Sequence, residues 1–355
     1  MTTYWILFTL ILIIHIFPAL KKTEKTSNRK LIFSLIVLFI YGSIRVDFGR
    51  DYEAYENIFN NVKLYFSFFN NEDNFEIGYL LLNKITPSFR FLIILLSGLT
   101  CISYYFLFKK YVPYKYYWVG FLLMAIFGQM MVFFQFSGLR NAIAVNILTL
   151  SIPLIKERKI ILFSLLTLLA FFFHNSAFFF LPLAYFIAIP TKFQKKELLF
   201  WVVSFLFFLI ASTSSLLDII TPFVNIYFDR YTPYLDMVGT KKMSTFLLYG
   251  FVGIMFIMTL LILLKEQLSS DDNVILKLSL LFLLSFLLGA LNFRMSQYFA
   301  PYFLVSTTIV LYRVKQPLLK YGYLCTVITY MLYAFFIVFM GMSDFPYVEI
   351  HTIFD

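Results

Sequence analysis

Long, unbroken apolar runs are the feature that most limits what this chain can fold into, and many of them extend for about 20 residues. An α-helix needs about 20 apolar residues to cross the hydrocarbon core of a bilayer. Hydrophobic residues make up 61% of the chain and charged residues only 14%, which is too few to cover a water-exposed surface. The apolar residues do not alternate with polar ones, as they do in a transmembrane β-barrel. The sequence therefore predicts an all-α, polytopic membrane helical bundle.

The apolar runs divide the chain into about twelve predicted transmembrane helices. Their predicted limits are 4–20, 31–44, 89–108, 116–136, 138–155, 160–173, 175–189, 198–213, 244–264, 274–291, 297–312 and 320–341. The first run has neither a basic leader nor a small-residue cleavage site, so we interpret it as a retained helix. Residues 1–355 are thus expected to form a single integral membrane domain.

The distribution of charge between alternate loops predicts the orientation of the helices. The loops at 21–30, 109–115, 156–159, 190–197, 265–277 and 313–320 hold 19 of the 29 Lys and Arg residues but only 6 of the 19 acidic ones. Because short cytoplasmic loops are enriched in basic residues, this set is predicted to face the cytoplasm. Both termini are then expected on the outer side.

Several classes of partner and site are excluded by the same patterns. The net charge of +10 is scattered in small groups between apolar runs, so it does not indicate a nucleic-acid partner. The cytoplasmic loops are too short for a nucleotide-binding domain. Cys101 and Cys325 lie within apolar runs and have no CxxC or Cys/His spacing, so neither a disulfide framework nor a zinc site is expected. Nothing in these sequence patterns requires a cofactor, and we predict none.

Two predicted outer loops are longer than the others, at 45–88 and 214–243. Both are rich in aromatic and apolar residues, so we expect amphipathic helices that lie in the plane of the membrane interface. The first loop begins with the densest polar cluster of the chain, comprising Arg45, Asp47, Arg50, Asp51, Tyr52, Glu53 and Tyr55. Such a cluster is either a solvated, charge-balanced turn or a site where guanidinium groups bind an anion and carboxylates hold them.

Three further basic positions are predicted at the same outer face. Arg140 falls in the first turn of the fifth helix, after Ser137, where free backbone N–H groups and the helix dipole favour a phosphate. His174 separates two short runs of 14 and 15 residues, which indicates a junction below the membrane surface, in protein or beside a water-filled cleft. Arg294 follows the tenth run.

Each of these residues also has a structural interpretation. Arg140 and Arg294 could be interfacial anchors, and His174 could be a satisfied core histidine. Four basic positions at one face nevertheless favour a polyanion site, because inward placement of charge is costly in a membrane. We do not expect His15 or His351 to be catalytic.

Five short motifs, in order, make the chain resemble the EpsG-like and Wzy-type polysaccharide polymerases. They are R-x-x-x-G-R-D-Y-x-x-Y at 45–55, F-E-x-G-Y at 75–79, G-L-R-N-A-I-A at 138–144, F-H-N-S-A at 173–177 and R-x-x-x-Y-F at 294–299. The family commonly has glutamine where this chain has Asn141.

The resemblance implies a fold similar to the GT-C glycosyltransferases and a location in the bacterial inner membrane, with the active site on the outer side. The implied reaction moves a glycan from undecaprenyl pyrophosphate onto the non-reducing end of the next lipid-linked unit of O-antigen, capsule or exopolysaccharide. Undecaprenyl pyrophosphate is the leaving group. A chain-length regulator and a flippase of the same pathway are the implied protein partners.

The implied chemistry gives the candidate residues their expected roles. Arg140 and Arg294 are expected on the pyrophosphate, and Arg45 and Arg50 either join them or hold the acceptor sugar. His174 and Asp51 are equal candidates for the general base. Tyr52, Tyr55 and Glu76 are expected to position sugar hydroxyls and backbone.

Three alternatives stay open at the level of the sequence. Asp47 and Asp51 could bind a divalent cation, although a cluster equally rich in arginine makes a metal redundant, and we predict none. A flippase or transporter of lipid-linked oligosaccharide would also need many helices and a cationic cavity, but with polar groups toward both faces. The third alternative is a non-catalytic partner in an exopolysaccharide synthesis complex.

Overall fold

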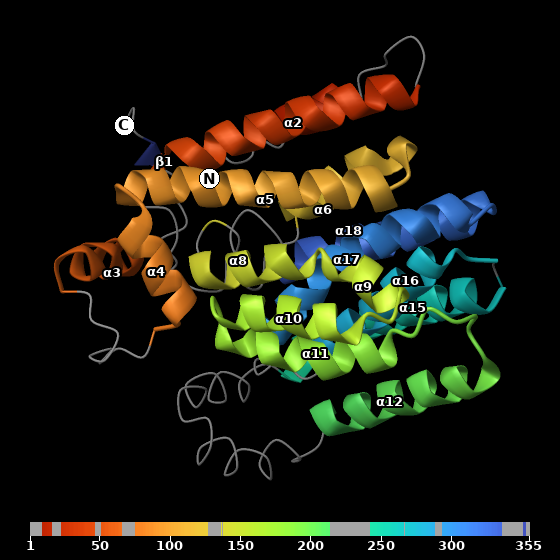
Figure 1. The fold of residues 1–355 in the computed structure, drawn as a ribbon. Coiled ribbons are helices and arrows are strands. Elements are labelled where there is room, and N and C mark those ends of the chain that lie inside the picture. Colours follow the sequence, from red (N-terminus) through yellow and green to blue (C-terminus); the bar gives the residue numbers. More distant parts are fainter. Residues whose placement is uncertain are drawn as a thin grey trace.

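The computed structural model describes residues 9–15, 23–46, 51–65, 75–126, 136, 138–213, 242–265, 267–287, 293–335 and 351–352. Most of these residues are helical, and the helices run beside one another as a bundle (Figure 1). The predicted all-α class is therefore confirmed. The predicted loop at 214–243 lies almost entirely outside the described residues.

Helices occupy the described parts of all the predicted apolar runs. The longer ones are α2 (Glu24–Ile44), α5 (Phe89–Tyr111), α6 (Tyr117–Ile126), α8 (Leu139–Leu148), α10 (Ile160–Phe171), α12 (Lys195–Thr213), α15 (Lys242–Lys265), α16 (Ser270–Leu287), α17 (Phe293–Arg313) and α18 (Pro317–Phe335). Among the described helices, α2 and α5 meet the length and composition needed to cross a membrane. Shorter apolar helices include α8 and α10. The count of twelve spans stays a prediction.

Two predicted helices are interrupted in the structure. The run at 138–155 forms α8 and then α9 (Ser151–Lys156), with a turn between them. Pro153 explains this break, because its ring would clash with the carbonyl of Thr149 in a continuous helix. The run at 175–189 forms the 3₁₀-helix η2 (Asn175–Phe179), the short α11 (Phe180–Pro182) and the π-helix η3 (Leu183–Ile187).

Two short helices in the predicted outer loop lie together at one end of the bundle, α3 (Tyr52–Tyr65) and α4 (Ile77–Ile85) (Figure 1). The buried face of α3 presents Tyr52, Tyr55, Phe59 and Val62 at helical spacing. This face packs against α4 and the start of α5, in a core cluster separate from that of the main bundle. The short strand β1 (Arg45–Val46) lies at the same end and pairs antiparallel with β2 (His351–Thr352).

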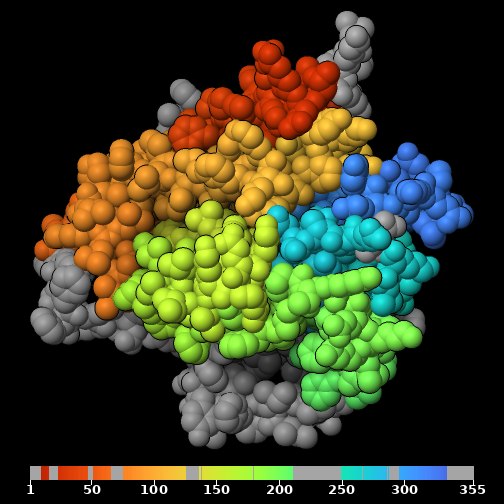
Figure 2. Space-filling view, turned by 45° about the vertical axis from the view of Figure 1, so that its right-hand side comes forward, coloured from red at the N-terminus to blue at the C-terminus, as the bar shows by residue number. Residues whose placement is uncertain are grey.

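The centre of the bundle is formed by α16 and α17, where Phe282 and Phe303 stack with ring centroids 4.7 Å apart. Around this pair, α2 and α12 lie on opposite sides of the bundle (Figure 1). The space-filling view shows α2 lying along the outer side of α5 (Figure 2). This arrangement places the ends of α8 and α10 beside α4, where the candidate site lies.

Gly78 allows α4 to approach the end of α10. Its N–H donates to the carbonyl of Phe172 at 2.9 Å, and a Cβ on Gly78 would lie 2.6 Å from that carbonyl oxygen. We expect Gly78→Ala to lower stability by about 1–3 kcal/mol, because neither backbone can yield easily. The loss should exceed the roughly 1 kcal/mol that alanine gains over glycine in a helix.

Thermal unfolding of the purified protein in detergent measures this effect. Gly322→Ala is the matched control, since a Cβ there would meet nothing within 4 Å. It should leave the unfolding temperature unchanged or raise it. Equal behaviour of the two variants would contradict the close approach at Gly78.

Candidate functional site

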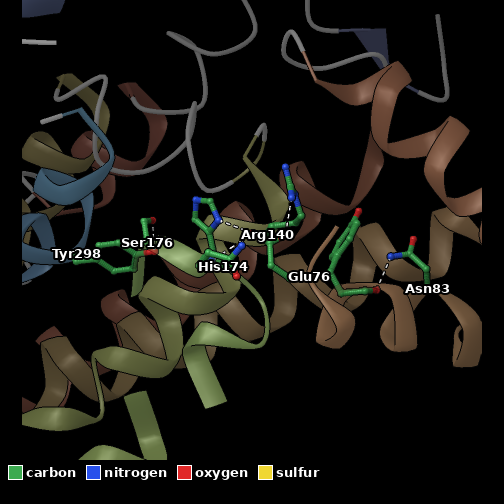
Figure 3. Close-up of polar contacts among 8 residues, drawn as sticks. Glu76, Asn83, Arg140, His174, Ser176 and Tyr298 are labelled. Atoms are coloured by element: carbon green, nitrogen blue, oxygen red, sulfur yellow. Dashed lines mark hydrogen bonds and ion pairs between the residues drawn. The ribbon is translucent and has the colours of Figure 1, made fainter. Parts of the chain in front are cut away.

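The carboxylate of Glu76 joins three groups from distant parts of the chain. Its Oε2 accepts from Nη1 of Arg140 at 2.5 Å, and its Oε1 accepts from Nδ1 of His174 at 3.0 Å. The backbone N–H of Asn175 donates to the same Oε1 at 3.2 Å. Figure 3 shows Arg140 and His174 both directed to Glu76. The Glu76 side chain is 5% exposed, so this is a buried carboxylate with charged and polar partners.

The backbone around Glu76 sets up this arrangement. Glu76 immediately precedes α4 in an extended conformation, and its side chain forms no cap on that helix. Across from it, α10 ends at Phe171, and His174 is extended before η2 begins. The break between α10 and η2 therefore leaves the N–H of Asn175 available, and the Glu76 carboxylate accepts it.

Arg140 is fixed on two sides. It lies in the first turn of α8, after Gly138, and its Cζ lies 5.0 Å from the ring centroid of Phe75. Glu76 engages Nη1, whereas Nε has no hydrogen-bond partner in the described part of the structure. The side chain is 22% exposed. Glu76 and Phe75 thus anchor the guanidinium, while part of the side chain stays exposed to another anion.

Glu76 is ionised in this environment. Burial by itself raises the pKa of Glu76, but the hydrogen bond with His174 and the charge of Arg140 outweigh it and lower the pKa to about 2. A carboxylate can only accept, so Nδ1 of His174 carries a proton in this contact. When the imidazole is neutral, its lone pair is therefore on Nε2.

Arg45 has a different environment from Arg140. It is fully buried, and Nη1 donates to the carbonyl of Gly42 and to Oγ of Ser97, the latter at 2.8 Å. The ring of Phe136 covers the guanidinium, with 4.5 Å between Cζ and the ring centroid. Among the described residues, its Nε and Nη2 have no hydrogen-bond partner. Arg45 therefore joins α2 to α5 rather than contacting Glu76.

The other residues of the polar cluster at 45–55 lie in different environments. Asp51 is exposed just before α3. Tyr52 and Tyr55 are buried and pack edge-on against Phe89 and Tyr79, with ring centroids 5.3 and 5.6 Å apart. The hydroxyl of Tyr55 also interacts electrostatically with Arg140. Asp47 and Arg50 lie outside the described residues.

Arg294 lies on α17, one turn before Tyr298, although its side chain is outside what the structure describes. Tyr298 and Ser176 form a buried hydroxyl pair at 2.9 Å, two residues beyond His174 (Figure 3). This pair places the first turns of α17 beside the junction that holds His174. Sequence reasoning missed Ser176 and Tyr298 as a pair, even though each lies within one of the five motifs.

The structure thus brings together Glu76, Arg140 and His174, with Tyr55 beside them. It does not place Arg45 in direct contact with this group, and Asp51 is linked to it through its electrostatic interaction with Tyr55. No group of three or more His, Cys, Asp and Glu side chains with the geometry to hold a metal ion occurs in the described ranges.

The family model of the EpsG family matches residues 30–349. The chain belongs to the EpsG family. Membership suggests a membrane polysaccharide polymerase of the glycosyltransferase type that acts on lipid-linked glycans. Glu76, Arg140 and His174 all lie within the matched region. Neither the curated proteins nor the solved structures contained a match to the chain.

We expect the ionised Glu76 to stabilise the fold in a pH-dependent way. A carboxyl group whose pKa falls from 4.5 to about 2 contributes stability above pH 4.5, and this contribution is lost as the pH falls toward 2. Glu76→Gln should lower stability at neutral pH by about 2 kcal/mol, because it removes the charge that pairs with Arg140. It should also remove the part of the stability loss at low pH that comes from protonation of Glu76.

Thermal unfolding temperatures between pH 7 and pH 3 measure both effects. Glu53→Gln is the control, since Glu53 is an exposed carboxylate on α3 at the same end of the bundle. The difference between the parent and Glu76→Gln should shrink as the pH falls, whereas Glu53→Gln should follow the parent. A constant difference would mean that Glu76 is not ionised in the fold.

Proposed function

We propose that this member of the EpsG family joins undecaprenyl-pyrophosphate-linked oligosaccharide units at the outer face of the bacterial inner membrane. The observation that carries the proposal is the buried Glu76 carboxylate, which holds an arginine and a histidine together at one end of the bundle. An anion-binding group and a potential base are thus within reach of the same substrate.

Arg140 acts on the leaving group. When the bond between the anomeric carbon and the pyrophosphate oxygen breaks, the electron pair goes to that oxygen and negative charge grows there. A guanidinium already fixed by Glu76 and Phe75 stabilises this charge without having to reorganise. Arg294, Arg45 and Arg50 are further candidates for the pyrophosphate or the acceptor sugar.

His174 acts as the general base. With Nδ1–H donated to Glu76, Nε2 takes the proton from the acceptor hydroxyl as its oxygen forms the new glycosidic bond. Glu76 orients the imidazole and stabilises the imidazolium that results. Asp51 is the competing base, but it is exposed and has no comparable orienting partner among the described residues. Tyr52 and Tyr55 remain candidates for positioning sugar hydroxyls.

The placement of the site at one end of the bundle supports the proposed orientation. The helices α3 and α4, the break at His174 and the β1–β2 pair all lie at this end (Figure 1). The basic segments 109–115 and 313–320, predicted to be cytoplasmic, include the far ends of α5 and α17. Lipid-linked units would then reach the site from the outer leaflet.

Incubating the purified protein with a defined undecaprenyl-pyrophosphate-linked unit should give a ladder of longer products. We expect Arg140→Ala to slow ladder formation by about 10²- to 10³-fold, because it removes charge stabilisation at the leaving group. His174→Ala should slow it by about 10²- to 10⁴-fold, through loss of the base. Gel separation of the glycans measures both rates.

Arg29→Ala is the control, because Arg29 is exposed near the start of α2, at the opposite end of the bundle. It should retain the parental rate. His174→Ala at the parental rate, with Asp51→Asn inactive, would transfer the role of base to Asp51. No ladder from the parent, combined with transfer of the lipid-linked unit across vesicle membranes, would instead identify a flippase.

We expect the ladder to form at an unchanged rate in excess EDTA. Arg140 and the other candidate guanidinium groups would supply the positive charge that a divalent cation otherwise provides at a pyrophosphate. Rates measured before and after chelation, with Mg²⁺ or Mn²⁺ added back, test this expectation. A loss on chelation that either cation restores would contradict it.

A further inference from the structure

A small cavity lies at the end of the bundle opposite Glu76, between the first helical residues, the start of α2 and the start of α6. His15 lines it from residues 9–15, and Lys30 lines it from α2. Lys115 belongs to η1 (Tyr114–Tyr116), the 3₁₀ turn that precedes α6. The cavity is thus built from three parts of the chain.

The lining of the cavity is basic. Lys30 and Lys115 contribute ammonium groups from separate elements, and Ser27 contributes a hydroxyl from the first turn of α2. None of the described residues that line it carries a carboxylate. His15 is engaged with Ser34, with 3.1 Å between Nε2 and Oγ. Two ammonium groups and a hydroxyl are the chemistry that binds a phosphate.

The surroundings favour a phosphate that belongs to a lipid. Tyr114 and Trp118, both half-buried, also line the cavity, and such amphipathic rings lie at the level of lipid headgroups. The start of α2, one of the helices able to cross a membrane, lines the cavity. Its lining comes largely from the segments 21–30 and 109–115, which are predicted to face the cytoplasm, where anionic lipids attract basic pockets between helices.

We propose that this cavity binds the phosphate of an anionic membrane lipid through Lys30 and Lys115. The headgroup lies between α2 and η1, with Ser27 as a hydroxyl partner, and the acyl chains extend into the bilayer beside α2. This site is independent of the polymerase site, because it uses different residues at the opposite end of the bundle.

Native mass spectrometry of the full chain in detergent tests the proposal. Phosphatidylglycerol should bind the parent more tightly than phosphatidylcholine, which carries no net charge. The double variant Lys30→Ala, Lys115→Ala should bind phosphatidylglycerol about thirtyfold more weakly, since each lysine near the surface contributes about one factor of five to six. Lys195→Ala, Lys196→Ala is the matched control, because both lysines are exposed at the start of α12.

Three outcomes would overturn the proposal. The parent could bind both lipids equally, the two double variants could lose affinity for phosphatidylglycerol equally, or the Lys30→Ala, Lys115→Ala variant could bind phosphatidylglycerol as tightly as the parent. If the Lys30→Ala, Lys115→Ala variant unfolds at a lower temperature than the parent, the single variant Lys115→Glu replaces it, because Lys115 is exposed. Inorganic phosphate distinguishes the source of the anion. At millimolar concentration it should not displace phosphatidylglycerol, and lysine-dependent displacement would instead assign the cavity to free phosphate.

Discussion

A single buried carboxylate holds the candidate site together. Glu76 is almost completely removed from solvent, and burying an ionised carboxylate is costly unless charged or hydrogen-bonding partners compensate. Arg140, His174 and the N–H of Asn175 supply that compensation from helices far apart in the sequence. The same contacts that stabilise Glu76 therefore also fix the two side chains proposed to perform the chemistry.

The non-helical junction at His174 also depends on contacts with the start of α4. Where α10 ends, backbone groups lose their helical partners, and such groups are expensive to leave unpaired in a membrane. Gly78 donates to the carbonyl of Phe172, and Glu76 accepts the N–H of Asn175. The segment that carries the carboxylate thus also satisfies the broken backbone, which explains how a non-helical junction persists here.

The buried cations of this chain are stabilised in different ways. Arg140 pairs with Glu76, and Lys277 is fully buried on α16, where its Nζ lies 2.6 Å from the carboxylate of Glu197. Arg45 has carbonyl, hydroxyl and aromatic neighbours among the described residues instead of a carboxylate. Because pairing differs between them, similar basic residues in the sequence have distinct roles in the structure.

The sequence by itself determined the class of fold, because runs of apolar residues can satisfy their backbone in lipid only as helices. It also identified Arg140 and His174 as candidates, since polar residues at the ends of apolar runs stand out, whereas Glu76 became a candidate only through the F-E-x-G-Y motif of the family resemblance. It did not show that Glu76 joins the other two, nor that Pro153 and the region of η2 break predicted helices. Those contacts join residues 64 and 98 positions apart, and only the packing of α4 against α8 and α10 decides them, through the need to compensate a buried charge.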